Sequence, residues 1–246
     1  HHSPVSAVSP FTQNLEHDTS VGPFKVLIED EKACARYSGL VIEGVTVKES
    51  PTWLKNRLQS IGVRSINNIV DITNYILHET GQPLHAFDAS EIKENKVVVK
   101  KYAAGTKFTT LDGVERTLQA NDLMITDGAK PLCIAGVFGG LQSGVKATTT
   151  NIFLESAWFE NVHIRKTSLH HGLRTDAATR FEKGVDVDGT VKVLLRAAKM
   201  IQDIAGGKCS DVVDVYPNPA KKAVVHLSFS YLKKLSGKTY PVDKVK

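Results

Sequence analysis

The sequence predicts an α+β fold, and three observations favour it over a repeating βαβ arrangement. Strand-like runs rich in β-branched residues recur through the first two thirds of the chain. Helical periodicity is inserted between these runs at 51–62 and 68–80, and it dominates again from about 160 to 205. No internal repeat is found in the sequence. Strands and helices segregated in this way are typical of α+β proteins.

The composition excludes several classes of protein. Hydrophobic side chains make up 41% of the 246 residues and charged ones 23%, with a mean hydropathy of −0.15, which excludes disorder and collagen-like structure. No apolar run is long enough to cross a bilayer, and the first residues lack the regions of a signal peptide. We therefore expect no membrane partner.

The three cysteines, Cys34, Cys133 and Cys209, are widely spaced and odd in number. Such a set is neither a disulfide framework nor a zinc-binding pattern. We interpret each as a small core side chain in a protein of the reducing cytoplasm, and we predict no metal site.

The net charge of +5 is unevenly distributed. Residues 217–246 contain seven Lys and one Asp, whereas the first 216 residues contain 24 basic and 25 acidic side chains. The basic excess therefore belongs to the C-terminal segment, and the body of the chain is not predicted to bind nucleic acid over its whole surface.

The chain is expected to begin with a connector and two strands. Residues 1–23 contain several Pro, Ser, Thr and Gly and predict a connector, in which we interpret His1 and His2 as the remnant of a purification tag. Strands are predicted at 24–30 and 37–48 from their β-branched residues.

Two helices follow in the prediction. Pro51 is expected to begin the first, with Ser50 as its N-cap, and Gly62 to end it. The second is predicted over 68–80 and ends at Gly81. The apolar residues of the first helix fall on one face: Trp53, Leu54, Leu58 and Ile61.

Strands return after the second helix. They are predicted at 96–102 and 107–118, and the pair Asp112-Gly113 within the latter indicates a hairpin. The segments DLMITD, PLCIAGVFGG and NIFLESAWF continue as short strands.

The last third is predicted to be helical and then to leave the domain. Helices are expected to break near Gly172 and Gly184. Pro217 and Pro219 indicate a linker, after which VHLSFSYLKKLSGKTY begins a new strand and helix. The clearest helix precedes the linker and carries apolar residues at helical spacing: Val191, Leu194, Leu195, Ala198 and Ile201.

Glu155 lies in the run NIFLESAWF, where alternation places it on one face with Phe153 and Ala157. A carboxylate among such apolar neighbours is costly without a partner. Two interpretations stay open: an edge strand whose carboxylate faces water, or a buried carboxylate that recognises a ligand hydroxyl or a cation.

Polar residues are concentrated at 170–186, within a segment, 163–183, that carries five basic and two acidic side chains. This segment could clamp phosphates, or it could be a solvated helix face with ordinary ion pairs. A triad of Ser168, His171 and Asp176 is disfavoured because the G-x-S-x-G elbow motif is missing.

Two further motifs have open interpretations. The glycine-rich run at 135–144 is neither a dinucleotide-binding nor a Walker motif, and we expect a tight turn or a backbone surface against which a ligand packs. His85 follows a turn and lies close in sequence to Asp88. It is either a structural residue or a catalyst.

Four long motifs in this order resemble the B3/B4 editing domain of the β subunit of bacterial phenylalanyl-tRNA synthetase. They are RSINNIVDITNYILHETGQPLHAFD, IAGVFGGLQSGV, NIFLESAWF and HHGLRTDAATRFEKGVD. The resemblance covers residues 36–216, preceded by a connector at 1–35 and followed at 217–246 by a linker and the start of the adjoining B5 domain. It implies a β-rich, sandwich-like core of unusual topology with packed helices.

The resemblance also implies an activity. The chain would belong to an α2β2 phenylalanine–tRNA ligase of the cytoplasm, whose α subunit holds the synthetic site with ATP and magnesium. The β-subunit domain would hydrolyse tyrosine wrongly esterified to phenylalanine tRNA, without a cofactor of its own. The alternative is a noncatalytic module that docks tRNA or scaffolds the subunits.

Individual residues acquire roles by their position in the motifs. Glu155 matches the residue that recognises the tyrosine hydroxyl. His85, Asn74 and Thr175 match residues of the editing pocket, and we hypothesise that they position a bound water that attacks the ester. Further residues of the substrate pocket are Thr73, Arg64, Gly136, Gly139 and Ala177. The basic residues predicted to contact tRNA are Arg165, Lys166, Arg174 and Arg180.

Overall fold

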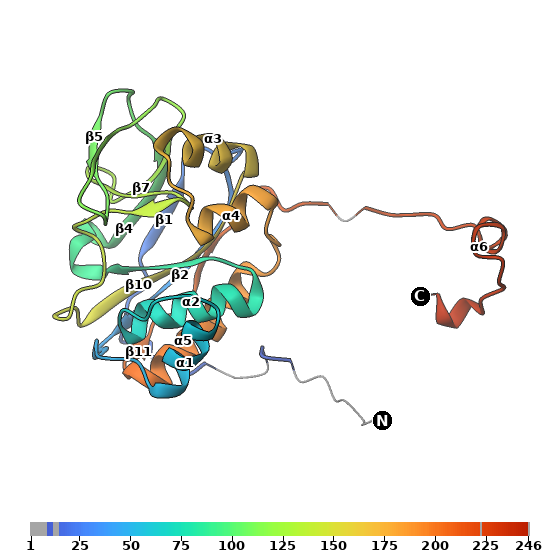
Figure 1. Ribbon diagram of the computed structural model, residues 1–246, viewed down its shortest axis with the longest axis horizontal. Helices are drawn as coiled ribbons and strands as arrows, with labels where there is room; N and C mark the ends of the chain where they lie inside the picture. The colour runs from blue at the N-terminus through green and yellow to red at the C-terminus, as the bar shows by residue number, and fades with distance from the viewer. Residues whose placement is uncertain (1–8, 12–14, 222, 246) are drawn as a thin grey trace.

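Two main sheets and a layer of helices make up the body of the protein, in agreement with the α+β prediction (Figure 1). The computed structural model describes residues 9–11, 15–221 and 223–245. The interpretation of His1 and His2, and the parts of the predicted connector at 1–8 and 12–14, lie outside these ranges.

The secondary-structure elements follow in chain order. The strands are β1 (Lys25–Ile28), β2 (Cys34–Glu43), β3 (Leu84–Asp88), β4 (Lys96–Lys101), β5 (Lys107–Thr109), β6 (Glu115–Thr117), β7 (Leu123–Thr126), β8 (Pro131–Ile134), β9 (Phe138–Gly139), β10 (Asn151–Phe159), β11 (Lys208–Cys209) and β12 (Val213–Val215). The helices are α1 (Thr52–Ser60), α2 (Asn68–Thr80), α3 (Asn161–His171), α4 (Asp176–Lys183), α5 (Thr190–Ala205) and α6 (Phe229–Ser236).

The central sheet has the strand order β11-β2-β10-β3, with β12 also paired to β2, and all of its pairs are antiparallel. A second sheet has the order β1-β4-β7-β8-β9, and β5 and β6 form a separate hairpin. Strand β10 therefore lies between two neighbours, so its backbone is not an edge. This position decides the environment of every side chain on β10.

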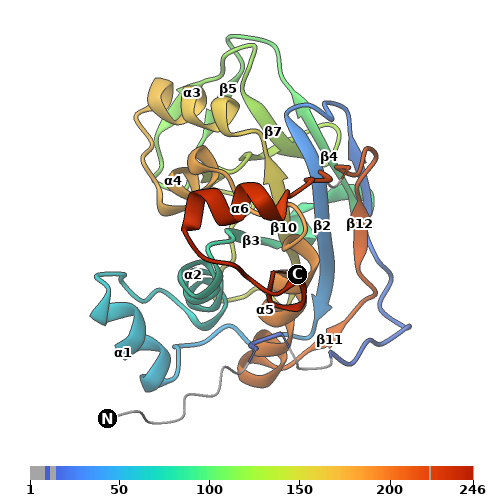
Figure 2. The same cartoon turned by 90° about the vertical axis from the view of Figure 1, so that its right-hand side faces the viewer.

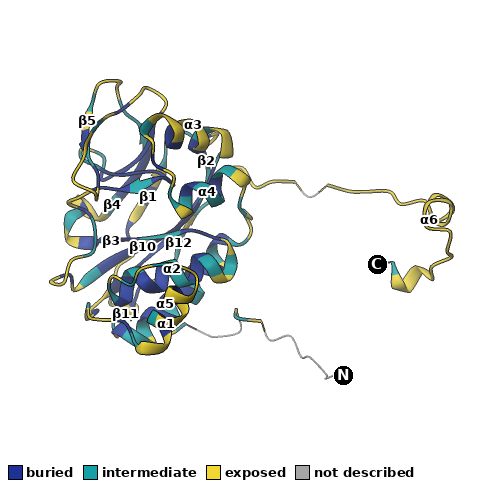
Figure 3. Ribbon diagram, viewed as in Figure 1, coloured by how far each residue is buried: buried dark blue, intermediate teal, exposed yellow. Residues whose placement is uncertain are grey.

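Each face of the central sheet packs against a different layer. Ile152 and Leu154 of β10 join a core cluster with apolar residues of α1, α2 and α5, whereas Phe153 and Ala157 join a cluster shared with the second sheet. The alternation predicted for β10 is thus confirmed. Figure 3 shows the buried residues gathered along the sheets and the inner sides of the helices. The result is a helix–sheet–sheet sandwich.

Helix α2 begins and ends where the sequence predicts. The Asn67 side chain accepts hydrogen bonds from the backbone N–H groups of Ile69 and Val70, and so caps the first turn. Gly81 ends the helix in the left-handed conformation, with a φ of 81° that favours glycine. The glycine signal is local in sequence, which is why the end of the helix is predicted correctly.

Helix α1 differs from the prediction at its start. Pro51 occupies the N-cap position and makes no side-chain capping bond. Ser50 donates instead to the buried carboxylate of Asp71, at 2.5 Å. Asp71 also accepts from the hydroxyl of Ser65 and from the backbone N–H of Ile66, so it holds the segment after α1 against α2.

The apolar face predicted for α1 is only half correct. Leu54 and Leu58 are buried against α2, but Trp53 and Ile61 are 46% and 52% exposed. Helix α1 is short and packs mainly on one neighbour, so only one row of its side chains reaches the core. Trp53 rests on the ring edge of Tyr75, with 5.8 Å between ring centroids.

Most of the other predicted elements are confirmed. The hairpin around Asp112 forms from β5 and β6, and three helices separated near Gly172 and Gly184 follow residue 160. The strand predicted over 37–48 is shifted to Cys34–Glu43 and ends at Gly44. Strand β3 is not predicted, because its five residues mix polar and apolar side chains.

The chain leaves the body after β12. Figure 1 shows this segment running outward to α6, which stands apart from the two sheets. Figure 2 looks along the segment, so that α6 is drawn in front of the body. In the described residues 223–228 the strand expected before α6 is not formed. The N-terminal segment lies against the body from His17 onward. The Nδ1 atom of His17 is 2.8 Å from the Ser210 carbonyl oxygen, and β1 pairs in parallel with β4.

The cysteines are buried and free, as predicted. Across the described ranges, no helix has the length and apolar character needed to cross a membrane.

Gly39 offers a test of the packing between the sheets. A Cβ at this position of β2 would lie 2.3 Å from Cζ of Phe153, whose ring is stacked between Phe24 and Tyr37. We expect Gly39→Ala to lower the free energy of unfolding by about 1–3 kcal/mol because the ring has no space to move. Urea unfolding measures the change. The control is Gly22→Ala, where a Cβ meets nothing within 4 Å, and an equal effect of the two variants would contradict this packing.

Candidate functional site

A cavity of about 600 Å³ opens where α2, β3, the loop between β8 and β9, and the start of α4 meet. Its walls are mainly apolar, and the tip of the β5–β6 hairpin closes one side with Leu111 and Asp112. Among the described residues that line the cavity there is no Lys and no Arg, whereas carboxylates are present. A largely apolar cavity with a few polar groups is typical of a small-molecule site.

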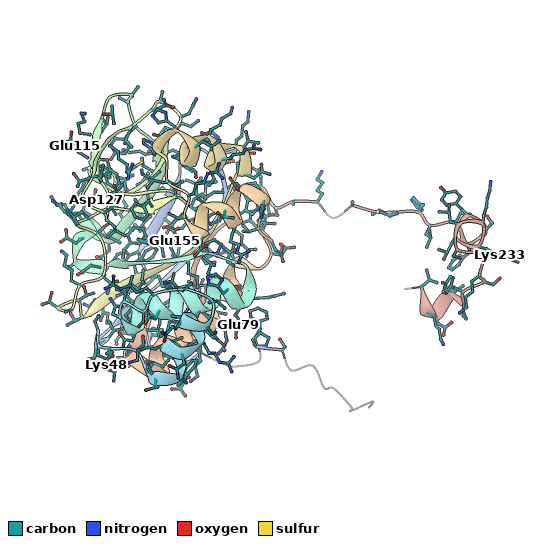
Figure 4. All side chains as sticks on the ribbon, in the orientation of Figure 1. Lys48, Glu79, Glu115, Asp127, Glu155 and Lys233 are labelled. Atoms are coloured by element: carbon teal, nitrogen blue, oxygen red, sulfur yellow. The ribbon has the colours of Figure 1, made fainter. Side chains whose placement is uncertain are left out.

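Glu155 lies in the wall of this cavity, at the middle of β10. Its register partners are Gly39 on β2 and His85 on β3, and its side chain is 5% exposed. Figure 4 labels Glu155 near the centre of the body, whereas Glu115 and Asp127 lie toward its periphery. The interpretation of an edge-strand carboxylate facing water is therefore wrong, because β10 is a central strand.

Among the described residues, the carboxyl group of Glu155 has one hydrogen-bond partner. The hydroxyl of Tyr37 on β2 donates to Oε2 at 2.6 Å, and Oε1 has no hydrogen-bond partner among the described residues. Burial raises the pKa of Glu155 to about 7, and the Tyr37 hydrogen bond partly opposes this rise. Both the protonated and the ionised forms are therefore present near neutral pH.

His85 is the cross-strand neighbour of Glu155 in the cavity wall. Its ring meets the ring of Phe87 edge-on, with 4.4 Å between centroids, and its Nε2 is buried without a hydrogen-bond partner in the described part of the chain. Burial lowers the pKa of His85 to about 4. The imidazole is thus neutral at physiological pH, able to donate from one nitrogen and accept at the other.

The polar groups that the helices contribute to the cavity differ in whether their hydrogen-bond donors are already used within the fold. The Thr73 hydroxyl donates to the Val70 carbonyl oxygen at 2.7 Å. The Thr175 hydroxyl donates to the Val137 carbonyl oxygen at 2.9 Å while capping α4. Both protons are thus committed to the fold. Asn74, which also lines the cavity, has no side-chain hydrogen bond to any described residue.

Two glycines shape the wall opposite α2. A Cβ at Gly139 would lie 2.9 Å from Cε1 of His85 and 2.8 Å from Cδ1 of Leu111, so only glycine lets these side chains approach. Gly136 has a φ of 65°, and a Cβ there would meet Phe159 and Phe181 instead. The space beside Gly136 is thus filled by core rings and adds no volume for a ligand.

The cavity brings together most of the residues predicted for the site. Those that line it are Thr73, Asn74, His85, Gly136, Gly139, Glu155, Thr175 and Ala177. Arg64 is exposed on the segment after α1 and is not among the lining residues, although its neighbour Ile66 is. Of the basic residues on α3, α4 and the segment between them, Arg180 is half-buried and three are exposed: Arg165, Lys166 and Arg174.

The disfavoured triad is not formed. The Ser168 hydroxyl donates to the Leu173 carbonyl oxygen, and His171 pairs with Asp122 at 2.7 Å rather than with Asp176. In the described ranges no three His, Cys, Asp or Glu side chains are grouped to hold a metal ion.

Tyr37, Leu111 and Asp112 are parts of the site that the sequence analysis missed. Tyr37 is 118 positions from Glu155 and meets it only because β2 and β10 pair. The hairpin motif predicts a turn at Leu111 and Asp112 but not what the turn touches. Here Leu111 N–H donates to the carbonyl oxygen of Gly139 at 3.0 Å, which fixes the tip on the cavity.

The fold and the cavity together define an α+β module with a buried carboxylate in the wall of a mainly apolar cavity. Residues 33–206 match the family model described as the B3/4 domain. The chain belongs to the B3/4 domain family.

Relatives and a solved structure extend this result and confirm the resemblance. The chain is 51% identical over 231 residues to a Bacteroides fragilis protein named phenylalanine–tRNA ligase beta subunit, covering 94% of this chain and 28% of the relative. A Porphyromonas gingivalis protein of the same name is 53% identical over 234 residues, covering 95% and 29%. The chain thus spans less than a third of the length of the curated relatives it matches.

The fold is also similar to a crystal structure of an N-terminal fragment of the phenylalanyl-tRNA synthetase beta subunit from Pyrococcus horikoshii. The TM-score is 0.53 at 13% identity, and the match covers 94% of this chain and 65% of that one. At this identity the likeness concerns the fold alone.

The raised pKa of Glu155 makes a prediction about stability. Folding raises this pKa from 4.5 to about 7, so the contribution of Glu155 to stability is complete below the lower value and is lost as pH rises through the higher one. Between pH 5 and pH 8 we expect the wild type to lose about 2–3 kcal/mol of unfolding free energy relative to Glu155→Gln. Urea unfolding across this range measures the difference. Glu115→Gln, at an exposed position, is the control, and parallel profiles for wild type and Glu155→Gln would contradict the expectation.

Proposed function

We propose that this chain is part of the β subunit of a phenylalanine–tRNA ligase and that its cavity hydrolyses the ester between tyrosine and phenylalanine tRNA. The name of the relatives supports the first part. One observation carries the second: a buried carboxylate, Glu155, lies in the wall of an otherwise mainly apolar cavity, and its Oε1 has no partner among the described residues. An aromatic ring that bears a hydroxyl group would supply that partner.

A second site with this preference meets a physical need of the ligase. A hydrophobic pocket that selects phenylalanine rejects an analogue with one added hydroxyl by only about 10²-fold. A hydrolytic site that requires the hydroxyl reverses the preference. Phenylalanine in this cavity would leave the Glu155 oxygen desolvated and unpaired, at a cost of about 1–3 kcal/mol and more for the charged form.

The proposed hydrolysis uses a bound water rather than a covalent nucleophile. Asn74 and the neutral imidazole of His85 would orient the water toward the ester carbonyl carbon. Thr175 would act by holding the start of α4 to the Val137 carbonyl oxygen, because its own proton is committed there. The first turn of α4 lies in the cavity wall, and its positive dipole end would favour the negative charge that develops on the carbonyl oxygen.

The rest of the assembly is proposed from the family. The four basic residues Arg165, Lys166, Arg174 and Arg180 would contact phosphates of phenylalanine tRNA, because none of them forms an ion pair with a described residue and three are exposed. The partner would be an α subunit in an α2β2 ligase of the cytoplasm. ATP and magnesium would belong to that subunit, as the resemblance to the family implies.

A noncatalytic module that docks tRNA or scaffolds the subunits is the second candidate. One observation favours it: the low pKa of His85 makes the imidazole a weak base, and the hydroxyl protons of Thr73 and Thr175 are used within the fold. A scaffold would show no hydrolysis of tyrosyl-tRNA above the rate in buffer, whichever cavity residue is changed.

Replacing Glu155 tests the proposed selectivity. In the intact ligase, we expect Glu155→Ala to reduce the preference for deacylating tyrosyl-tRNA over phenylalanyl-tRNA by about tenfold or more, because one charge-assisted hydrogen bond is lost. The ratio of the two deacylation rates is measured with phenylalanine tRNA charged with each amino acid.

The matched control for this experiment is Glu115→Ala, which removes an exposed carboxylate on β6. It should leave the ratio unchanged. An unchanged ratio in Glu155→Ala as well would rule out the role assigned to Glu155.

Gly139 tests the position of the cavity wall. The backbone at Gly139 lies against His85 and Leu111, so an indole at Gly139→Trp must displace them or fill the cavity. We expect the rate of tyrosyl-tRNA deacylation to fall by about 10²-fold or more, because the substrate and the groups around it are no longer correctly positioned. Gly22→Trp, at an open surface position, is the control, and thermal unfolding reports whether the variant folds. Wild-type deacylation by folded Gly139→Trp would show that the wall is misassigned.

A further inference from the structure

Tyr37 is the only described residue that touches the Glu155 carboxyl group by a hydrogen bond, and it does so from outside the cavity. It is fully buried on β2, across from Ala157 of β10, and it is not one of the cavity-lining residues. Its ring lies parallel to that of Phe153, with 6.5 Å between centroids. The close approach of Gly39 to Phe153 leaves these rings no room to shift. Tyr37 is therefore rigidly placed.

The single proton of the Tyr37 hydroxyl decides which oxygen of Glu155 can bind a ligand. No described residue offers that hydroxyl a second acceptor, so its proton points at Oε2. Oε2 is then an acceptor in every protonation state. When Glu155 takes up a proton, the proton must reside on Oε1, the oxygen left for the cavity.

The other groups that face Glu155 do not compete for this role. They are the thiol of Cys34 beside Tyr37, the thiol of Cys133 on β8, the neutral imidazole of His85 on β3, the uncharged amide of Asn74 on α2 and the carboxylate of Asp176 at the start of α4. Burial and the charge of Glu155 raise the pKa of both thiols well above their usual value, so they stay protonated. No cation is among these groups.

We propose that Tyr37 is a specificity-determining positioning residue, which confines the exchangeable proton of Glu155 to the cavity-facing oxygen and so makes that oxygen an acceptor at high pH and a donor at low pH. The hydroxyl of tyrosine can donate or accept, so it pairs with Oε1 in both states. A para-amino group, which mainly donates, pairs only with the ionised form. The inference rests on the proposed function for its substrate class alone.

The test measures binding of amides of para-substituted phenylalanines to the chain. Amides are used because the amino acid in the proposed substrate is esterified and has no free carboxylate. With the wild type, the affinity for 4-aminophenylalaninamide relative to tyrosinamide should rise about tenfold between pH 5.5 and pH 8.5. In Glu155→Gln, where Tyr37 holds the amide oxygen and the NH2 group faces the cavity, the ratio should be low and independent of pH.

Tyr37→Phe isolates the positioning role, because it keeps the ring and removes only the hydroxyl. The apparent pKa of Glu155, followed by carboxyl 13C NMR, should rise by about one unit, since the ionised form loses its hydrogen bond. The preference for tyrosinamide over phenylalaninamide should fall about tenfold. Tyr102→Phe removes a hydroxyl bonded to Thr126, and neither of these residues lines the cavity, so this variant is the control and should change neither quantity.

Two outcomes would overturn the proposal: a wild-type affinity ratio that does not change with pH, or a Glu155 titration that Tyr37→Phe leaves in place. If none of the amides binds, the substrate class of the proposed function fails. The NMR titration of Tyr37→Phe still decides the role of Tyr37 in that case, since it needs no ligand.

Discussion

The contact between the Tyr37 hydroxyl and the buried carboxyl of Glu155 is the constraint on which the rest of the site depends. It places an ionisable group at the middle of a central strand, at a distance of 2.6 Å from its one hydrogen-bonding partner among the described residues. Water would normally solvate such a group, but both neighbours of β10 and the sheet facing it exclude solvent. One oxygen of this carboxyl group, Oε1, therefore has no hydrogen-bond partner among the described residues, and it is the oxygen left available to the cavity.

The packing around this contact holds the Tyr37 phenol and the buried Glu155 carboxyl group in position. Gly39 lets the ring of Phe153 lie directly against β2, and the stacked rings of Phe24, Phe153 and Tyr37 fix the phenol from one side. Gly139 shapes the cavity in the same way, because its lack of a side chain lets His85 and Leu111 approach the backbone. Rigid apolar surroundings hold a few polar groups in set directions, and the same burial shifts the pKa values of Glu155 and His85 in opposite senses.

Local sequence signals predict the elements better than the contacts between them. The stop at Gly81 and the alternation around Glu155 depend on residues a few positions apart, and both predictions are correct. Whether β10 is central or an edge depends on strand pairing across the chain, so the sequence left both interpretations of Glu155 open. The partner Tyr37, the strand β3 and the exposure of Trp53 could not be predicted for the same reason: each is decided by tertiary packing.

The absence of Lys and Arg from the described lining of the cavity has a consequence for turnover. Under the proposed function, the esterified amino acid would carry an ammonium group and no carboxylate, so the carboxylates of Asp176 and of ionised Glu155 would attract it, whereas Asp112 is paired with Arg116. Hydrolysis would create a carboxylate on the amino acid within the same walls, where like charges would repel it. The electrostatics of the cavity would thus help the proposed product to leave.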